Sequence, residues 1–205
     1  MSAETVAYLV RHGMHDWLRP GGNRLAGRTP GVAMNADGRR EAAHVAAMLA
    51  ERPLRWVAAS PIERTMETAR YIAEPHGLEV AADERFLEWA LGPWEGMWIE
   101  AIQQRYAEEW RTWREHPLAL RLPGAETLEQ VAERMEQGCL AWMARGGEGV
   151  IVSHQDPLAA LLARLIGMPL GSMRALHVST GSVSAVRQSR FGVVVESVNT
   201  GVALA

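Results

Sequence analysis

Short apolar segments that alternate with helical patterns are the feature that most limits how this chain can fold. Val6–Val10, Trp56–Ala59 and Val150–Ser153 are each brief and mostly apolar, as is typical of strands that are buried on both faces. A segment with helical periodicity follows each of them. Strands and helices in alternation favour a parallel sheet with helices packed on its faces. The sequence therefore predicts an α/β fold, a three-layer sandwich whose central sheet is mostly parallel and flanked by helices.

Three further segments have the properties of strands. Glu79–Ala82 is a candidate for another strand of the same sheet. Near the C-terminus, Ser182–Arg187 and Val193–Val198 alternate between apolar and polar residues and are separated by a tight turn. Alternation is typical of strands that have one side facing solvent. We therefore expect these two segments to form a hairpin at an edge of the sheet.

Start and stop signals place the helices. Asn35 precedes a helix whose apolar residues recur at helical spacing. Ser60 and Glu63 have the spacing of a capping box, with Ser60 as the N-cap of the next helix. Residues 126–145 form a long amphipathic pattern that ends at two glycines, and residues 156–168 predict a buried, apolar helix.

The length of 205 residues suits a single domain, and the chain has no internal repeat. We expect residues 1–205 to form one domain with an insertion at about 89–122 that acts as a lid. This insertion is helical in period from about Ile99 and is rich in tryptophan: Trp89, Trp94, Trp98, Trp110 and Trp113. Such residues are more often part of a core than a ligand platform, but their clustering predicts an apolar wall or lid over the active site.

Composition excludes several classes of protein. All 21 basic residues are arginine, which removes the P-loop lysine, the pyridoxal Schiff base and the serine/lysine hydrolases. Cys139 is the only cysteine and the four aspartates are far apart, so the sequence predicts no metal site and no cofactor. A net charge of −3 without a basic cluster argues against nucleic-acid binding. The N-terminal apolar run is too short for a signal peptide or a membrane span, so we expect a cytoplasmic protein.

Chemically active side chains follow three of the predicted strands. The first strand leads into Arg11 and His12, and the strand that ends at Ser153 leads into His154. The strand Trp56–Ala59 is followed, after one helical turn, by Arg64. Ligands of open α/β sheets bind beyond the carboxyl ends of the strands. Two imidazoles and two guanidiniums at one such edge predict a site for a dianion such as phosphate.

Six blocks in order carry a resemblance to a known family. They are Leu9-Val10-Arg11-His12-Gly13; Ala26-Gly27-Arg28 with Asn35–Ala42; Ala59–Ala69; Leu87-Glu88 with Gly92–Gly96; Pro123–Thr127; and Val152-Ser153-His154. They resemble the motifs of the histidine phosphatases, also called the phosphoglycerate mutase-like superfamily. The resemblance covers nearly the whole chain and implies a metal-independent enzyme that acts on phosphate esters.

The resemblance implies roles for five residues. His12 would attack phosphorus and become phosphohistidine, while Arg11, Arg64 and His154 would hold the equatorial oxygens. Glu88 would protonate the leaving alkoxide and then deprotonate the attacking water. A nucleophilic imidazole must be neutral on its attacking nitrogen, so His12 needs a partner for its other ring nitrogen, which the sequence does not identify.

Further substrate contacts are expected from Gly27 and Arg28, whose loop faces the same strand ends, and from Gln155. Glu95 is interpreted as a turn or helix-start residue and not as the catalytic acid. Two interpretations of His15 stay open: it is a loop residue without a functional role, or it forms part of the pocket rim.

Departures from the family pattern leave the substrate undetermined. Met14 replaces the usual Glu or Gln, Leu18 replaces a polar Asn of many mutases, and Gln155-Asp156 replaces the usual Gly.

The leading hypothesis is a phosphatase that hydrolyses a small phosphomonoester through phosphohistidine. One alternative is a phosphoglycerate mutase, which the short insertion disfavours. The other is an inactive phospho-ligand binding protein, which is disfavoured because all five residues with implied catalytic roles are present. The expected partner is a small-molecule phosphate ester, with no nucleic acid and no membrane. Whether the chain forms a homodimer stays open.

Overall fold

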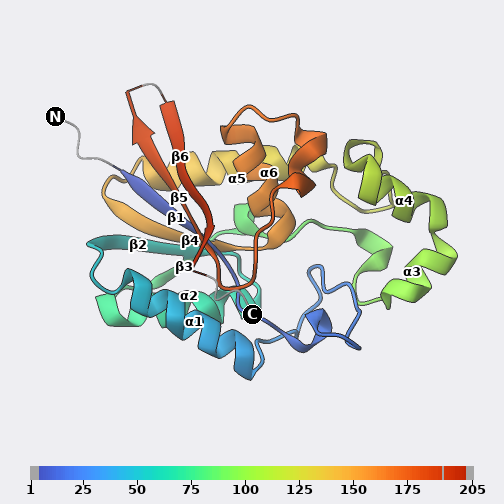
Figure 1. Ribbon diagram of the computed structural model, residues 1–205, viewed down its shortest axis with the longest axis horizontal. Helices are drawn as coiled ribbons and strands as arrows, with labels where there is room; N and C mark the ends of the chain where they lie inside the picture. Colours follow the sequence, from blue (N-terminus) through green and yellow to red (C-terminus); the bar gives the residue numbers. More distant parts are fainter. Residues whose placement is uncertain (1–4, 191, 202–205) are drawn as a thin grey trace.

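The computed structural model describes residues 5–190 and 192–201, which are built around a six-stranded sheet (Figure 1). Four neighbouring strands run parallel, β5 is antiparallel to β1, and β6 is antiparallel to β5. The mostly parallel α/β prediction is therefore confirmed. In their order across the sheet, the strands are β3 (Val80–Ala82), β2 (Leu54–Ala59), β4 (Glu148–Ser153), β1 (Val6–Arg11), β5 (Val183–Ser189) and β6 (Gly192–Thr200).

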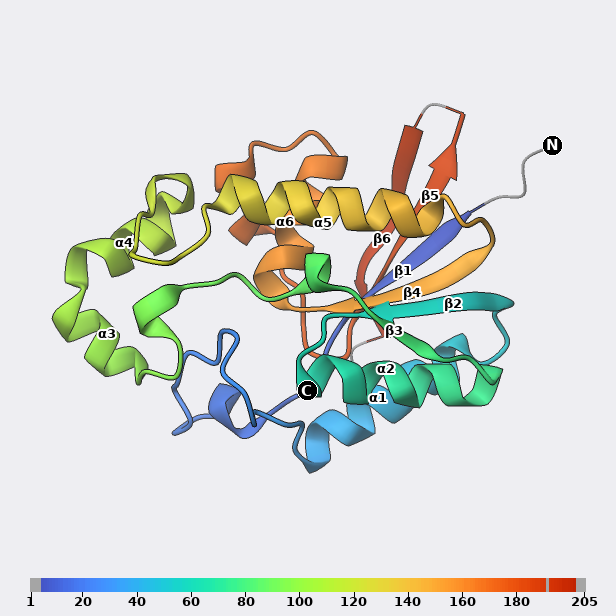
Figure 2. The ribbon, with the colours of Figure 1, turned by 180° about the vertical axis from the view of Figure 1, so that it is seen from behind.

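Helices cover both faces of the sheet, which gives the three predicted layers (Figures 1 and 2). One face carries α1 (Ala36–Leu49) and α2 (Glu63–Ala73), and the other carries α5 (Leu128–Met143) and α6 (Gln155–Leu165). Alternate residues of β1, β2 and β4 enter the two cores. In β1, for example, Leu9 packs with the α5 and α6 side, and Val10 packs with the α1 and α2 side.

The predicted C-terminal hairpin is present as β5 and β6. β5 begins one residue later and ends two residues later than expected, and β6 begins one residue earlier and ends two residues later. β6 lies at the sheet edge and alternates between exposed and half-buried residues along its whole length. Phe191, within the predicted turn, lies outside the described residues. The same holds for residues 1–4 and 202–205 of the predicted domain.

The predicted capping box at Ser60 is wrong. Helix α2 begins at Glu63 with Ile62 as its N-cap, and no side chain caps it. Ser60 is fully buried and its hydroxyl lies 3.0 Å from a ring nitrogen of His154, so it contacts this buried histidine and does not cap the helix. Thr65 holds the bend instead, since its hydroxyl donates to the Ser60 carbonyl at 2.8 Å.

A complete capping box occurs at the start of α5. The Thr127 hydroxyl accepts from the Gln130 amide, and the Gln130 side chain accepts from the Thr127 amide. The helix ends at Met143, two residues before the predicted Arg145. The apolar helix α6 likewise ends at Leu165, three residues before the predicted end.

The insertion lies beyond the carboxyl ends of the parallel strands, where α3 (Ile99–Arg105) and α4 (Ala107–Glu115) occupy one end of the molecule (Figure 1). Trp94 packs against Trp110 and Trp113 and is fully buried. Trp98 differs from the expected core placement, with 51% of its surface exposed. The remaining elements are short 3-10 turns: η1 (Asp16–Leu18), η2 (Glu74–His76), η3 (Glu84–Phe86), η4 (Gly92–Trp94), η5 (Pro117–Ala119) and η6 (Leu170–Ala175).

Within the described ranges, no helix combines the length and apolar character needed to cross a membrane.

The sheet order places the chemical residues together. β4 lies between β1 and β2, so the segments that follow these three strands are neighbours. The paired residues Arg11 and Ser153 show that β1 and β4 end at the same level. Gly13 then allows the chain to pass close to α1, because a Cβ there would lie only 2.3 Å from the Gly38 carbonyl oxygen.

Candidate active site

A cavity of about 200 Å³ opens at the carboxyl ends of β1, β2 and β4. It is smaller than the 300–1,000 Å³ that is common for small-molecule sites. Its walls combine charged and apolar side chains. The lining residues are Arg11, His12, His15, Leu18, Arg24, Leu25, Ala26, Gly27, Arg64, Glu88, Leu91, Ile99, Trp113, Gln155, Asp156 and Arg174.

His12 is buried at the base of the cavity, and its two ring nitrogens have different partners. Nδ1 lies 2.8 Å from the carbonyl oxygen of Gly13, and Nε2 accepts a hydrogen bond from Nε of Arg64 at 3.2 Å. A carbonyl can only accept, so the proton resides on Nδ1 and Nε2 carries the lone pair. Burial, together with the charges of Arg64 and Arg11, lowers the pKa of His12 well below its usual value. The imidazole is therefore neutral, with a nucleophilic nitrogen.

Arg64 crosses the floor of the site from the first turn of α2 and is almost fully buried. One terminal nitrogen donates to the Gly27 carbonyl at 2.8 Å and to Nδ1 of His154 at 3.2 Å. The other terminal nitrogen, NH1, is buried and has no hydrogen-bond partner within the described ranges. Burial lowers the pKa of this guanidinium. An anion in the cavity would supply the missing acceptor.

Arg11 repeats this pattern at the end of β1. One terminal nitrogen donates to the side chain of Gln155 and to the Val178 carbonyl, both at 2.7 Å. Its Nε is buried and finds no partner in the described part of the chain. Burial lowers the pKa of Arg11 to about 10, which still leaves it charged at neutral pH. Buried cations with unmatched donors are stabilised by a bidentate anion.

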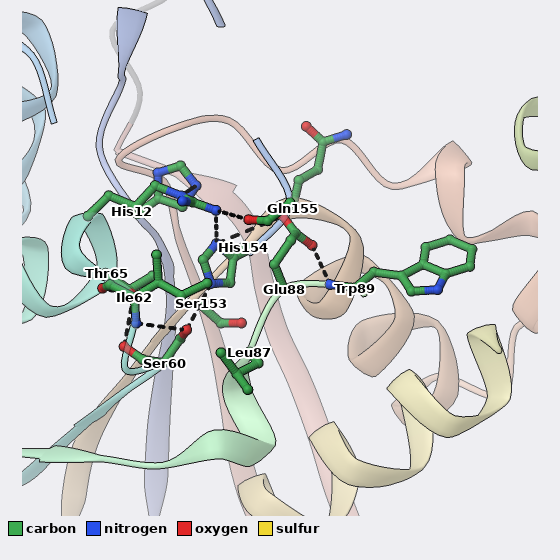
Figure 3. A network of polar contacts seen from close by, with 12 residues as sticks. His12, Ser60, Ile62, Thr65, Leu87, Glu88, Trp89, Ser153, His154 and Gln155 are labelled. Carbon is green, nitrogen blue, oxygen red and sulfur yellow. Dashed lines mark hydrogen bonds and ion pairs between the residues drawn. The ribbon is translucent and has the colours of Figure 1, made fainter. Parts of the chain in front are cut away.

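His154 is fully buried at the N-terminus of α6 and lies between Ser60 and the His12 ring (Figure 3). Its Nδ1 accepts from Arg64, so the ring proton is on Nε2 and is donated to the Ser60 hydroxyl at 3.0 Å. The rings of His12 and His154 are 5.1 Å apart between centroids. Burial and the charge of Arg64 lower the pKa of His154 well below its usual value, so this ring is also neutral.

The Glu88 carboxyl group faces the same space (Figure 3). One oxygen accepts from the Trp89 amide at 2.9 Å, and the other lies 3.8 Å from Nδ1 of His154. Burial, and next the negative charge of Asp156, raise the pKa of Glu88 to about 7. A carboxyl group with this pKa exchanges a proton readily at neutral pH.

A network behind the cavity wall holds the Glu88 backbone. Arg28 and Arg134 both donate to the Glu88 carbonyl, at 2.8 and 3.1 Å. Both also donate to Glu126. Burial acts to raise the pKa of Glu126, but the hydrogen bond and charge of Arg134 outweigh it, so the pKa is lowered. Arg28, expected as a substrate contact, is therefore engaged in this network and does not line the cavity.

Gly27, the other residue expected from this loop, does line the cavity. Its φ of 50° favours glycine, and a Cβ there would lie 2.7 Å from the Glu95 side chain. Glu95 accepts from the amides of Arg28 and Leu91, at 3.2 and 3.1 Å. It is a loop-holding residue, as expected, and it does not line the cavity.

The residues that depart from the family pattern have different positions. His15 lines the cavity with its ring stacked on His12, and burial lowers its pKa to about 3. Leu18 and Asp156 also line the cavity, whereas Met14 does not. The Met14 amide instead donates to Glu41 at 2.7 Å.

Two cavity arginines were not expected from the sequence. Arg24 belongs to the loop after β1, and Arg174 belongs to η6 and pairs with Asp156 at 3.2 Å. Arg24 lies in the same loop that follows the first strand and carries His12, and this position in the sequence could have identified it as a cavity residue. Arg174 gave no such signal, because 162 residues of chain separate it from His12.

In the described part of the chain, no three His, Cys, Asp or Glu side chains gather closely enough to hold a metal ion. The expected absence of a metal stays a prediction that chelation experiments test.

Comparison with known proteins places this geometry in a family. The chain matches the model of the histidine phosphatase superfamily (branch 1) over residues 7–201. Phosphoserine phosphatase 1 of Hydrogenobacter thermophilus is 30% identical to it over 87% of this chain and 84% of that protein. The probable phosphoglycerate mutase GpmB of Serratia proteamaculans is 31% identical over 87% of this chain and 83% of its own.

Solved structures agree with this assignment. The putative alpha-ribazole-5'-P phosphatase of Escherichia coli superposes with a TM-score of 0.86 at 25% identity, and the match covers 98% of both chains. The Bacillus stearothermophilus protein YhfR shares the fold with a TM-score of 0.90 at 24% identity, over 97% of this chain and 98% of that one. With a family match that spans nearly all of its length, this chain belongs to the histidine phosphatase superfamily.

Proposed function

We propose that this protein is a metal-independent phosphatase that hydrolyses a small phosphomonoester through a phosphohistidine intermediate. The observation that carries the proposal is the tautomer of His12. The Gly13 carbonyl accepts a hydrogen bond from Nδ1, which leaves a neutral Nε2 in contact with the buried Arg64 guanidinium, and the charge of the buried Arg11 also acts on the ring. A nucleophile inside a cationic site is suited to attack a phosphoryl group, whose negative charge would otherwise repel it.

In the first step, Nε2 of His12 attacks phosphorus as the bond to the ester oxygen breaks. The unpartnered nitrogens of Arg11 and Arg64 donate hydrogen bonds to the equatorial oxygens and stabilise their negative charge. A contact from Nδ1 of His154 to phosphate requires a second proton on that ring, which the ring takes up from solvent as the dianion binds and returns as phosphate leaves. Glu88, with a pKa of about 7, donates its proton to the leaving alkoxide.

In the second step, water attacks the phosphohistidine. Glu88, now ionised, takes a proton from the water as the new phosphorus–oxygen bond forms and the phosphorus–nitrogen bond breaks. His12 regains its lone pair and inorganic phosphate leaves. Each group returns to its starting protonation state, so the cycle needs no other reactant.

The size of the cavity supports a small substrate, and its apolar wall supports a substrate with some carbon framework. The Hydrogenobacter relative is named a phosphatase and the Serratia relative a probable mutase, so both reactions occur among proteins similar to this one. A mutase must keep its phosphohistidine away from water, so an insertion whose α-helices have only seven and nine residues supports hydrolysis.

A panel of phosphomonoesters tests the proposal. We expect release of inorganic phosphate from at least one small ester, unchanged by EDTA and independent of added 2,3-bisphosphoglycerate. Loss of activity on chelation, restored by Mg²⁺ or Zn²⁺, would refute the metal-free mechanism. Phosphate transfer to 2- or 3-phosphoglycerate in preference to water would identify a mutase. Tight binding of esters without any turnover would identify a binding protein.

The pKa of Glu88 predicts a pH dependence. Because the acid must carry its proton, turnover of an alkyl phosphate should fall as pH rises through about 7. Asp156→Asn removes a negative charge that raises this pKa, so the descending limb should move to lower pH. The measurement is a kcat–pH profile. Asp37→Asn is the matched control, since Asp37 also pairs with arginines but at the surface, and it should leave the limb in place. Equal profiles for wild type and Asp156→Asn would contradict the assignment of Glu88.

A further inference from the structure

Arg24 stands out among the cavity residues because nothing balances its charge. Its Nε is buried without a hydrogen-bond partner, and no ion pair to it exists in the described part of the chain. Arg174, the other arginine outside the phosphate-facing set, is paired with Asp156. Arg11 and Arg64 are held by the contacts described above. Among the cavity arginines, Arg24 is therefore the one whose side chain has neither a hydrogen bond nor an ion pair to another described residue.

Two tryptophans hold the Arg24 guanidinium in place. Its central carbon lies 4.5 Å from the centroid of the Trp17 ring and 4.9 Å from that of Trp98. Indole rings orient a guanidinium and stabilise it by cation–π attraction, but they supply no acceptor for its N–H groups. The edge of the guanidinium thus remains available to a ligand.

The backbone around Arg24 is also held. Arg24 and Trp98 form an isolated antiparallel bridge, and the Leu25 amide donates to the Met97 carbonyl at 2.9 Å. On the other side of the bridge, the Ile99 amide donates to the Asn23 carbonyl at 2.8 Å. These bonds join the loop after β1 to the start of the insertion. An arginine that is fixed in advance loses little conformational entropy when it binds an anion.

The charges around the cavity leave an excess beyond what phosphate needs. Four arginines line it, and Asp156 neutralises one of them. The three cavity and floor histidines are neutral. When Glu88 carries its proton, three positive charges of arginine remain, and a phosphate dianion neutralises two. A proton that His154 takes up on phosphate binding adds to this excess, so at least one positive charge is left for another group of the same ligand.

We infer that Arg24, held by Trp17 and Trp98, is a second anion-binding site in this cavity and selects phosphomonoesters that bear a further anionic group. This inference rests on the proposed function, since the phosphoryl group must occupy the site next to His12. Apolar residues also line this cavity, among them Leu25 and Ile99, and they suit a short carbon chain that joins the two anionic groups.

The test uses two matched series of substrates. One consists of ω-carboxyalkyl phosphates with one to four methylenes, and the other of hydroxyalkyl phosphates of equal length. A third arm, with a terminal phosphate in place of the carboxylate, identifies which anionic group is preferred. Wild type is expected to show a higher kcat/KM for the anionic series at one chain length. Arg24→Gln should lower the ratio of anionic to neutral kcat/KM by about 10-fold or more, because a charged hydrogen-bond partner is lost.

Arg105→Gln is the matched control, since Arg105 is an exposed arginine of α3 outside the cavity, and it should leave the ratio unchanged. Calorimetry with the corresponding carboxyalkyl and hydroxyalkyl phosphonates gives a readout that needs no turnover. An equal loss on both series in Arg24→Gln, or no preference in wild type, would overturn the second anion site while the phosphatase stands. Phosphonates that bind with the expected preference and esters that are never hydrolysed would instead overturn the proposed function.

Discussion

His12→Ala is expected to abolish turnover of every phosphomonoester, with a fall in kcat on the order of 10⁴–10⁶-fold. The reason is that Nε2 of His12 is the nitrogen presented to the cavity with a lone pair, and its tautomer is set by the Gly13 carbonyl. Wild type, quenched rapidly in alkali, should yield a phosphoenzyme that is stable to base and labile to acid. The variant should yield none.

A control separates loss of the nucleophile from a general effect of removing a histidine. His177 is exposed, and His177→Ala should retain wild-type kcat and phosphoenzyme yield. Far-ultraviolet circular dichroism and a second variant, His12→Gln, check that the fold persists. Turnover by a folded His12 variant at more than about one hundredth of the wild-type rate would reject His12 as the nucleophile.

Glu88→Gln is expected to produce a defect that depends on the leaving group. Gln has nearly the shape of Glu but cannot supply a proton, so hydrolysis of alkyl phosphates should fall by about 10²–10⁴-fold. The p-nitrophenolate ion leaves without a proton, and phosphorylation of His12 by p-nitrophenyl phosphate should suffer much less. Because Glu88 also acts as the base toward water, the phosphoenzyme should accumulate, with a burst of nitrophenol. Stopped-flow absorbance measures that burst.

Glu95→Gln is the matched control for this experiment. Glu95 lies on the same loop, but its carboxylate accepts from the amides of Arg28 and Leu91. Its variant should not distinguish between alkyl and nitrophenyl esters. Equal slowing of the burst phase for both classes in Glu88→Gln would exclude Glu88 as the general acid. A leaving-group-dependent defect in Glu95→Gln alone would move that role to Glu95.

Much of the fold followed from local patterns. The buried strands and the edge hairpin were predicted because side-chain periodicity reflects which faces of an element are covered. The capping box was placed wrongly, at Ser60 in place of Thr127, because both segments offer a hydroxyl three residues before a Glu or Gln. Which hydroxyl turns toward its helix depends on what else it contacts. Ser60 faces His154, and no local pattern contains that contact.

The candidate site divides in the same way. The sequence by itself determined that His12 and His154 stand at the ends of buried strands and that Arg64 follows a third, because each lies within a few residues of its strand. Only the tertiary structure decided the partner of the His12 ring, the raised pKa of Glu88 and the placement of Arg28 behind the cavity wall.

Arg24 and Arg174 show why the remainder depended on the tertiary structure. Arg24 reaches the cavity because its loop pairs with the backbone at Trp98, and Arg174 reaches it from η6, where it meets Asp156. Hydrogen bonds and ion pairs between segments far apart in the chain set the position of each. Periodicity and motif spacing describe what lies within one element, whereas the charge and shape of a cavity arise from several elements that meet in space.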